Sequence, residues 1–309
     1  MVTIVGRLSR HVVIGCCTLV MMVAAVFATV PGARAQVAAP TGENIAPVYE
    51  GWEKNPDGSF NFVFGYFNRN WVEEIDLPVG LNNNIEPGGA DQGQPTHFLP
   101  RRNRFLFRIR IPRDFGEKEL VWTLTSHGKT ERAYATLKPD YFMDNDVIQN
   151  NTGASGGTGG RPDTLGNKAP ILKVEGDKIR EARVGQHVTL IALATDDGMP
   201  TARPLKLPEG RIFGNNRGTP GSATGLRLSW FVYRGAGKVT FDPPQITAWE
   251  DYREGRNSPW STGWSAPPAP PDGKWLARAT FSEPGTYVLR ALAHDGGLGT
   301  PEDITFVVK

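Results

Sequence analysis

Large apolar side chains recur at every second position in three runs of the first half of the chain, at 60–66, 105–111 and 120–124. Such alternation is typical of β-strands that bury one face. The Asn-Pro-Asp-Gly sequence at 55–58 favours a tight turn before the first run, because Pro presets φ and Gly accepts a positive φ. His127-Gly128 predicts a hairpin into a strand over 131–137. We therefore expect about six strands over 45–140, enough for a small β-sandwich.

Strand patterns return after Pro170. The expected strands cover 188–195, 226–234, 238–241, 275–281, 286–293 and 303–308. Their core-facing positions are Leu228, Trp230, Val232, Ala277, Ala279, Phe281, Tyr287, Leu289 and Ala291. Two intervals, 196–225 and 242–274, carry no strand pattern, and loops of such length are usually functional or disordered. We expect a second sandwich over 169–309.

The segment between the two blocks has a different composition. Residues 150–160 are Asn, Thr, Ser, Ala and Gly, with no side chain that could build a core. We expect residues 141–168 to form a flexible linker. The chain is thus predicted to be all-β, with two immunoglobulin-like sandwich domains joined by a Gly-rich linker.

Residues 1–35 have the pattern of a signal peptide. Arg7 and Arg10 precede an apolar run, and Ala33 and Ala35 satisfy the small-residue rule for cleavage before Gln36. An uncleaved anchor, or a lipid on Cys16, are the alternatives. The remainder holds no other apolar stretch long enough to span a bilayer. We expect a periplasmic or secreted protein.

Cleavage changes the charge and cysteine content. The whole chain has 34 Lys plus Arg and 32 Asp plus Glu, and the leader holds three Arg and no acid, so 31 bases face 32 acids at −1. Both cysteines, Cys16 and Cys17, lie in the leader. The mature chain therefore lacks disulfides and a catalytic thiol, and its charge argues against a nucleic-acid partner.

Three segments of the second block resemble the polycystic-kidney-disease (PKD) type of immunoglobulin-like domain. These are 184–190 running to Asp196-Asp197-Gly198, the strand 228–232 with its central Trp230, and 281–289 with Pro-Gly-Thr-Tyr, running to Asp295-Gly296. The resemblance implies an immunoglobulin-like fold and a role as a spacer or binding module in an exported protein. The chain as a whole resembles exported bacterial proteins.

Motifs for catalysis are poorly supported. Gly-Ala-Ser-Gly-Gly at 153–157 matches G-x-S-x-G, but Gly and Asn flank it instead of a strand and a helix. His97 lies in a Pro-bounded loop beside Arg101 and Arg102, where it is either a buried loop anchor or a catalytic base. The second possibility defines the alternative function, a periplasmic hydrolase or oxidoreductase, or a subunit of one, with its site around His97.

A cluster of arginines follows this loop. Its members are Arg101, Arg102, Arg104, Arg108, Arg110 and Arg113. Arg104, Arg108 and Arg110 share the outward face of the predicted strand, which favours a solvated face with acidic partners. The alternative is a patch that binds an anionic ligand.

Strand direction places the candidate binding residues. If the strands of the second sandwich alternate up and down, the loops 196–225, 242–274 and 294–302 meet at one pole. Trp249, Trp260 and Trp264 would stack on a sugar or a partner there, or else pin the long loop to its own sandwich. Asp196, Asp197 and Asp295 would lie nearby and could hold Ca²⁺, the one cofactor considered.

The sequence therefore predicts an exported, non-catalytic binding or scaffolding protein of the bacterial envelope. Its expected partner is a glycan or an envelope protein, and the loop pole of the second sandwich is its expected binding surface.

Overall fold

The computed structural model describes residues 39–153, 162–206 and 221–309, and residues 39–309 form one compact unit. The predicted signal peptide, the G-x-S-x-G segment beyond Gly153 and much of the 196–225 loop lie outside the described residues. Within the described part, no helix is long and apolar enough to cross a membrane.

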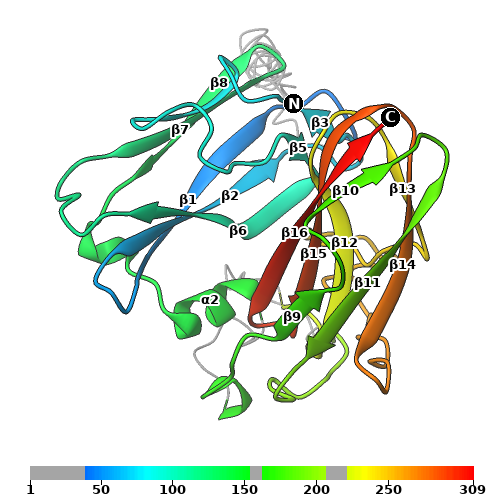
Figure 1. Cartoon of the computed structure of the whole chain (residues 1–309). Helices are drawn as coiled ribbons and strands as arrows, with labels where there is room; N and C mark the ends of the chain where they lie inside the picture. Colours follow the sequence, from blue (N-terminus) through cyan, green and yellow to red (C-terminus); the bar gives the residue numbers. More distant parts are fainter. Residues whose placement is uncertain (1–38, 154–161, 207–220) are drawn as a thin grey trace, which may run out of the picture. The chain divides into compact units, whose positions relative to one another are not determined.

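The first block forms two facing sheets (Figure 1). One sheet has the order β1 (Ile45–Lys54), β2 (Phe60–Asn68), β6 (Arg101–Ile111), and the other has the order β4 (Asn83–Glu86), β7 (Leu120–Ser126), β8 (Lys129–Ala135). Two short strands, β3 (Ile75–Asp76) and β5 (His97–Phe98), pair separately. Phe62, Phe64, Phe107 and Trp122 fill the space between the sheets with ring contacts.

The second block also forms a sandwich. Its sheets have the orders β13 (Val239–Asp242), β14 (Lys274–Phe281), β11 (His187–Thr195), β9 (Ile171–Val174), and β10 (Ile179–Ala182), β16 (Gly299–Val308), β15 (Gly285–His294), β12 (Arg227–Arg234). The nine positions expected to face the core all do so, including Leu228, Trp230 and Val232. We call the sheet β10-β16-β15-β12 the β12–β15 sheet.

Strand order assigns both sandwiches to the immunoglobulin-like fold. That fold places strands A, B, E and D in one sheet and C, F and G in the other. The second sandwich matches this order as β9-β11-β14-β13 and β12-β15-β16, and β10 pairs in parallel with β16. The first sandwich matches A-B-E as β1-β2-β6 and C-F-G as β4-β7-β8. The predicted all-β fold class is confirmed.

Local chemistry explains several of these elements. His127 and Gly128 have φ values of 46° and 72°, and Ser126 pairs with Lys129 around them. Two positive φ values in succession are the geometry of the two-residue hairpin that the sequence predicts.

Part of the predicted linker is structured, which corrects the expectation for 141–168. Residues Asn145–Thr152 form helix α2, and Asp144 caps it by accepting a hydrogen bond from Val147 N at 2.9 Å. Ile148 and Thr152 are buried, and the Thr152 hydroxyl donates to Gly297 O at 3.0 Å. The helix therefore packs against the second sandwich, because its short apolar face finds cover there.

Candidate ligand site between the two sandwiches

The outer face of the β12–β15 sheet forms the floor of a cavity. Alternate residues of a strand face opposite sides, so the partners of core residues point outward. On β12 these outward residues are Arg227, Ser229 and Phe231, which lie opposite His294, Leu292 and Arg290 of β15. The three β12 residues are buried even though they face away from their own core. The first sandwich covers this face.

A bulge in β6 supplies part of the roof. The ladder with β2 pairs Asn103 with Tyr66 and Phe107 with Phe64, and its register shifts between these pairs. Phe105 has a φ of 51°, which is rare for a bulky residue. The sequence pattern placed Phe105 in the core with Phe107, and this expectation is wrong. Because β6 has two extra residues between these pairs, the alternation is broken over 104–106, so Leu106 packs on the core and Phe105 lines the cavity.

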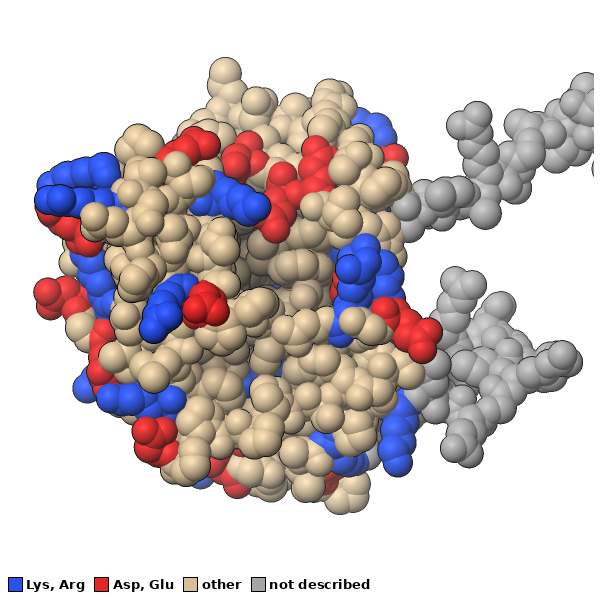
Figure 2. All heavy atoms as spheres, turned by 90° about the vertical axis from the view of Figure 1, so that its right-hand side faces the viewer, with Lys and Arg blue, Asp and Glu red and all other residues tan. Residues whose placement is uncertain are grey.

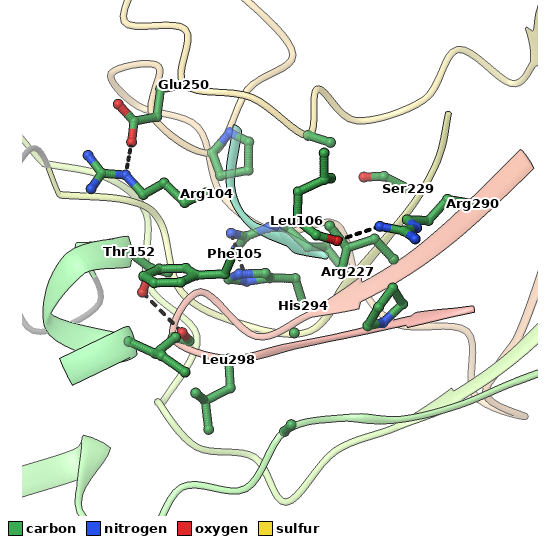
Figure 3. A pocket seen from close by; sticks show the side chains of 18 of the residues that line it. Arg104, Phe105, Leu106, Thr152, Arg227, Ser229, Glu250, Arg290, His294 and Leu298 are labelled. Carbon is green, nitrogen blue, oxygen red and sulfur yellow. Dashed lines mark hydrogen bonds and ion pairs between the residues drawn. The ribbon is translucent and has the colours of Figure 1, made fainter. Parts of the chain in front are cut away.

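The cavity has a volume of about 160 Å³. Apolar side chains from β6, α2 and the 242–274 loop line it, among them Phe105, Ile148 and Trp260. Figure 3 shows Phe105, Arg227 and His294 turned toward the same space. Small-molecule sites typically combine apolar walls of this kind with a few polar groups.

Four arginines at the cavity have carboxylate partners. Arg290 makes two bonds of 2.7 Å to Asp303 and also donates to Leu106 O. The other pairs are Arg102 with Glu50, Arg104 with Glu250 and Arg108 with Glu53. On β6, Arg104, Arg108 and Arg110 thus have acidic partners, Arg110 with Asp57, as the sequence predicts for a solvated face. Arg104 is nevertheless largely buried.

Arg227 differs from these four. Its side chain is 3% exposed, and the described residues offer it no carboxylate within ion-pair distance. Nη1 donates to Ala223 O at 2.9 Å, and Nη2 lies 3.4 Å from His294 Nδ1. Burial lowers the pKa of Arg227 to about 10, and the charge of Asp295 opposes that shift. The guanidinium still stays protonated at neutral pH.

Asp295 makes no ion pair with Arg227, and its charge acts on the Arg227 guanidinium only at a distance. Its carboxylate accepts hydrogen bonds from Gly297 N at 2.5 Å, Leu298 N at 2.7 Å and Asn167 Nδ2 at 3.1 Å. These bonds fix the turn between β15 and β16 that borders the cavity. Burial raises the pKa of Asp295 to about 6, and its hydrogen bonds oppose the shift.

His294 is a neutral neighbour of Arg227. Burial, and then the charge of Arg227, lower its pKa well below the usual value. Its Nδ1 accepts a hydrogen bond from Gly296 N at 2.8 Å, so the ring proton resides on Nε2. The imidazole is therefore a donor at the cavity wall.

The three loops predicted to meet at one pole do meet in their described parts. Gly225 N donates to Asp295 O at 2.6 Å, and Ala223 N donates to Pro259 O at 2.7 Å. The three tryptophans, however, do not form one platform. Trp260 lines the cavity, whereas Trp249 lines a separate hollow next to Trp230. Trp264 lies 5.6 Å from the Arg227 guanidinium and donates to Asn257 Oδ1 at 3.1 Å.

The predicted calcium ligands are not arranged as a metal site. Asp196 accepts from Gly198 N and Asp197 from Met199 N, both at 2.9 Å, which are turn contacts. Asp295 is committed to its own turn. Over 39–153, 162–206 and 221–309, no group of three or more His, Cys, Asp or Glu side chains is placed to hold a metal ion.

His97 is a buried anchor of the β3–β5 pair. Its Nδ1 lies 2.8 Å from Asp76 Oδ1, and its Nε2 lies 3.2 Å from Glu74 Oε2. Burial alone lowers its pKa, but the two carboxylates outweigh it and raise the pKa of His97 to about 9. The ring is charged at neutral pH and has no free nitrogen to accept a proton.

Surface charge agrees with the low net charge. On the face in Figure 2, which carries the second sandwich, basic and acidic side chains are interspersed without a patch of one sign.

The residues that sequence reasoning missed are Arg227, Ser229 and His294. Their strand positions predict solvent exposure, and only the packing of the first sandwich buries them. One feature of the sequence does indicate that this face is covered. Phe231 and Tyr233 are aromatic residues at outward positions of β12, where exposed large apolar side chains are unusual.

Comparisons with known proteins add distant similarities. No protein-family model matches the chain, and no curated protein matches its sequence. In structure, the chain is similar to the Yersinia pseudotuberculosis adhesin InvE, with 10% identity and a TM-score of 0.24, over 87% of this chain and 60% of that one. It is also similar to Sidekick-1 immunoglobulin domains 1–4, with 10% identity and a TM-score of 0.23, over 85% of this chain and 47% of that one. The D00-D0 domain of intimin gives 9% identity and a TM-score of 0.22, over 85% of this chain and 100% of that one. Because these TM-scores are below 0.5, the fold assignment rests on strand order alone.

Proposed function

We propose that this protein is an exported, non-catalytic binding protein that holds a small ligand in the cavity between its two sandwiches. The observation that carries the proposal is the position of the cavity. Residues of β12 and β15, whose side chains point away from their own core, meet the bulge of β6 around a cavity of about 160 Å³. A sandwich interface that served cohesion alone would be filled at this point, as protein interiors are.

The surroundings of His97 and His294 favour binding over catalysis at these two residues. A general base needs a nitrogen that can accept a proton near neutral pH. His97 has both ring nitrogens engaged by carboxylates, and His294 uses Nδ1 to accept from Gly296. Cys16 and Cys17 precede the proposed cleavage point, so no thiol would remain. The alternative function, an enzyme with its site around His97, therefore has less support.

The envelope location and the partner class rest on the sequence. The N-terminal segment favours export, and a glycan or envelope protein fits an immunoglobulin-like module with long polar loops. Of the three tryptophans proposed to bind a partner, Trp260 borders the cavity and would contact the small ligand there.

The test uses a cavity-filling variant. Ser229 lies on the cavity floor, so Ser229→Leu should fill the space, and Ser229→Ala should leave it open. Benzoate, benzamide, benzyl alcohol and benzylamine can be screened by saturation-transfer NMR. We expect at least one compound to bind the original protein and Ser229→Ala but not Ser229→Leu. If every compound binds Ser229→Leu as well as the original protein, or none binds either, the proposed function is wrong.

A further inference from the structure

The charge and the hydrogen-bond partners of Arg227 indicate which kind of ligand the cavity binds. A buried guanidinium is costly unless an opposite charge and hydrogen-bond acceptors compensate it. Arg227 borders the cavity and is 3% exposed, yet it has one carbonyl partner and one long contact to His294. A guanidinium has five N–H donors, so most of the Arg227 N–H groups have no hydrogen-bond acceptor among the described residues.

We propose that the cavity binds a small organic carboxylate, with the carboxylate group on Arg227 and an apolar body against Phe105, Ile148 and Trp260. This inference rests on the proposed function and adds the chemical class of the ligand. The planar fork of a guanidinium matches the two oxygens of a carboxylate and can form two parallel hydrogen bonds.

Two further donors stand beside Arg227. Ser229 follows it on the outward face of β12 and is 5% exposed, and its hydroxyl has no hydrogen-bond partner among the described residues. His294 lies directly opposite Arg227 on β15 and keeps its proton on Nε2. Arg227, Ser229 and His294 all line the cavity. The three donors therefore border one space.

The charges around the cavity favour one negative charge on the ligand. Arg102, Arg104, Arg108 and Arg290 already have carboxylate partners, which leaves Arg227 as the cation without one among the described lining residues. Glu53 and Glu250 line the same space and compensate Arg108 and Arg104, so Arg227 offers one positive charge to a ligand. A carboxylate satisfies this balance better than a phosphate dianion.

The size of the cavity limits the apolar body. Its volume of about 160 Å³ is close to that of a cavity that holds one benzene ring. The ligand body should therefore be a single ring or a short chain of about six to eight carbon atoms.

The experiment compares carboxylates with amides of the same shape. Benzoate and benzamide, phenylacetate and phenylacetamide, and hexanoate and hexanamide can be titrated into the protein by calorimetry, together with phenyl phosphate. We expect at least one carboxylate to bind tenfold or more tightly than its amide. The inference is overturned if no pair shows this preference, or if phenyl phosphate binds more tightly than every carboxylate.

Variants assign the preference to Arg227. Arg227→Gln should abolish the preference for the carboxylate while amide binding persists, and Arg227→Lys should retain part of it. Arg110→Gln is the matched control, because Arg110 lies on the same strand, is paired with Asp57 and does not line the cavity, so this change should leave the preference unchanged. An unchanged preference in a folded Arg227→Gln protein contradicts the inference alone. Undiminished binding of all ligands to Ser229→Leu contradicts the proposed function instead.

Discussion

The outer face of the β12–β15 sheet meets the first sandwich in two different ways. At one end, Tyr233 belongs to the hydrophobic core of the first sandwich, and its hydroxyl donates to Gly93 O at 2.5 Å. Thr96 N donates to Tyr233 O at 3.2 Å, and the Arg290 guanidinium lies 3.6 Å from the centre of the Tyr233 ring. We call this the closed end, because every polar group named here has a partner.

The other end, around Arg227, is open. Its floor residues occupy the same kind of strand position, but they border a cavity instead of a packed core. Arg290 and Arg227 make the contrast clear, because both are buried arginines at outward positions of neighbouring strands. Arg290 has Asp303, Leu106 O and an aromatic ring, whereas Arg227 has a carbonyl, His294 and Trp264 at longer range. The contacts at the closed end stabilise the interface between the sandwiches. At the open end, Arg227 retains N–H groups that can bind a ligand.

The largest effect should come from replacing these two arginines by Met. Arg290→Met removes a bidentate ion pair and a carbonyl contact, so we expect the free energy of unfolding to fall by about 2–3 kcal/mol. Arg227→Met removes a buried charge without a paired carboxylate, so the free energy of unfolding should stay the same or rise by about 1 kcal/mol. Urea unfolding measures both. Equal losses in the two variants would remove the distinction between the ends.

The next effect concerns pH at the β3–β5 pair, where His97 follows Thr96 of the closed end. The folded pKa of His97 is about 9 and its ordinary value is 6.5. A raised pKa stabilises the fold fully below pH 6.5, and this contribution is lost as the pH rises through 9. We expect a loss on the order of 1–2 kcal/mol between pH 6.5 and 9, since Asp76 and Glu74 are partly exposed. Urea unfolding should give a flatter pH profile for His97→Gln, and an identical slope would contradict the anchor role.

The sequence predicted the inward faces well, because core positions obey local alternation. Leu228, Trp230 and Val232 lie where period two places them, and so do Tyr287 and Leu289. The hairpin at His127-Gly128 follows from local turn chemistry in the same way. These features depend on neighbours within one strand or one turn, which the sequence contains.

The cavity depends on contacts between distant segments, and the sequence could not predict it. Arg227 and Ser229 have the pattern of a solvated strand face, and nothing in the alternation tells that another sandwich covers them. The pattern places Phe105 in the core, because the bulge in β6 leaves the apolar alternation over 105–111 intact in the sequence. In the linker, Asp144 caps α2, a contact that depends on a helix for which the polar sequence of this segment gives no apolar pattern.

A smaller effect should come from the Tyr233 hydroxyl. Tyr233→Phe keeps the ring in the core but leaves Gly93 O without its donor, which should cost about 1 kcal/mol of unfolding free energy. Tyr134→Phe is the matched control, because Tyr134 is exposed on β8, and it should change the value by less than about 0.5 kcal/mol. Thermal and urea unfolding of both variants measure the difference. If the two tyrosines give the same result, the hydroxyl contact contributes nothing to the closed end.

The smallest effect should appear at the rim of the closed end. Arg234 donates to Asp91 through two bonds of 2.7 and 3.1 Å, but the Asp91 side chain is 56% exposed. Water and salt screen such a pair, so Asp91→Asn should lower the free energy of unfolding by about 0.5 kcal/mol or less. Because the remaining effect is electrostatic, it should shrink further when urea unfolding is repeated in 0.5 M salt, roughly halving the Debye length from its value at 0.1 M. A loss above about 1 kcal/mol that persists in salt would mean that the rim also holds the sandwiches together. The closed end would then extend beyond the buried residues Tyr233 and Arg290.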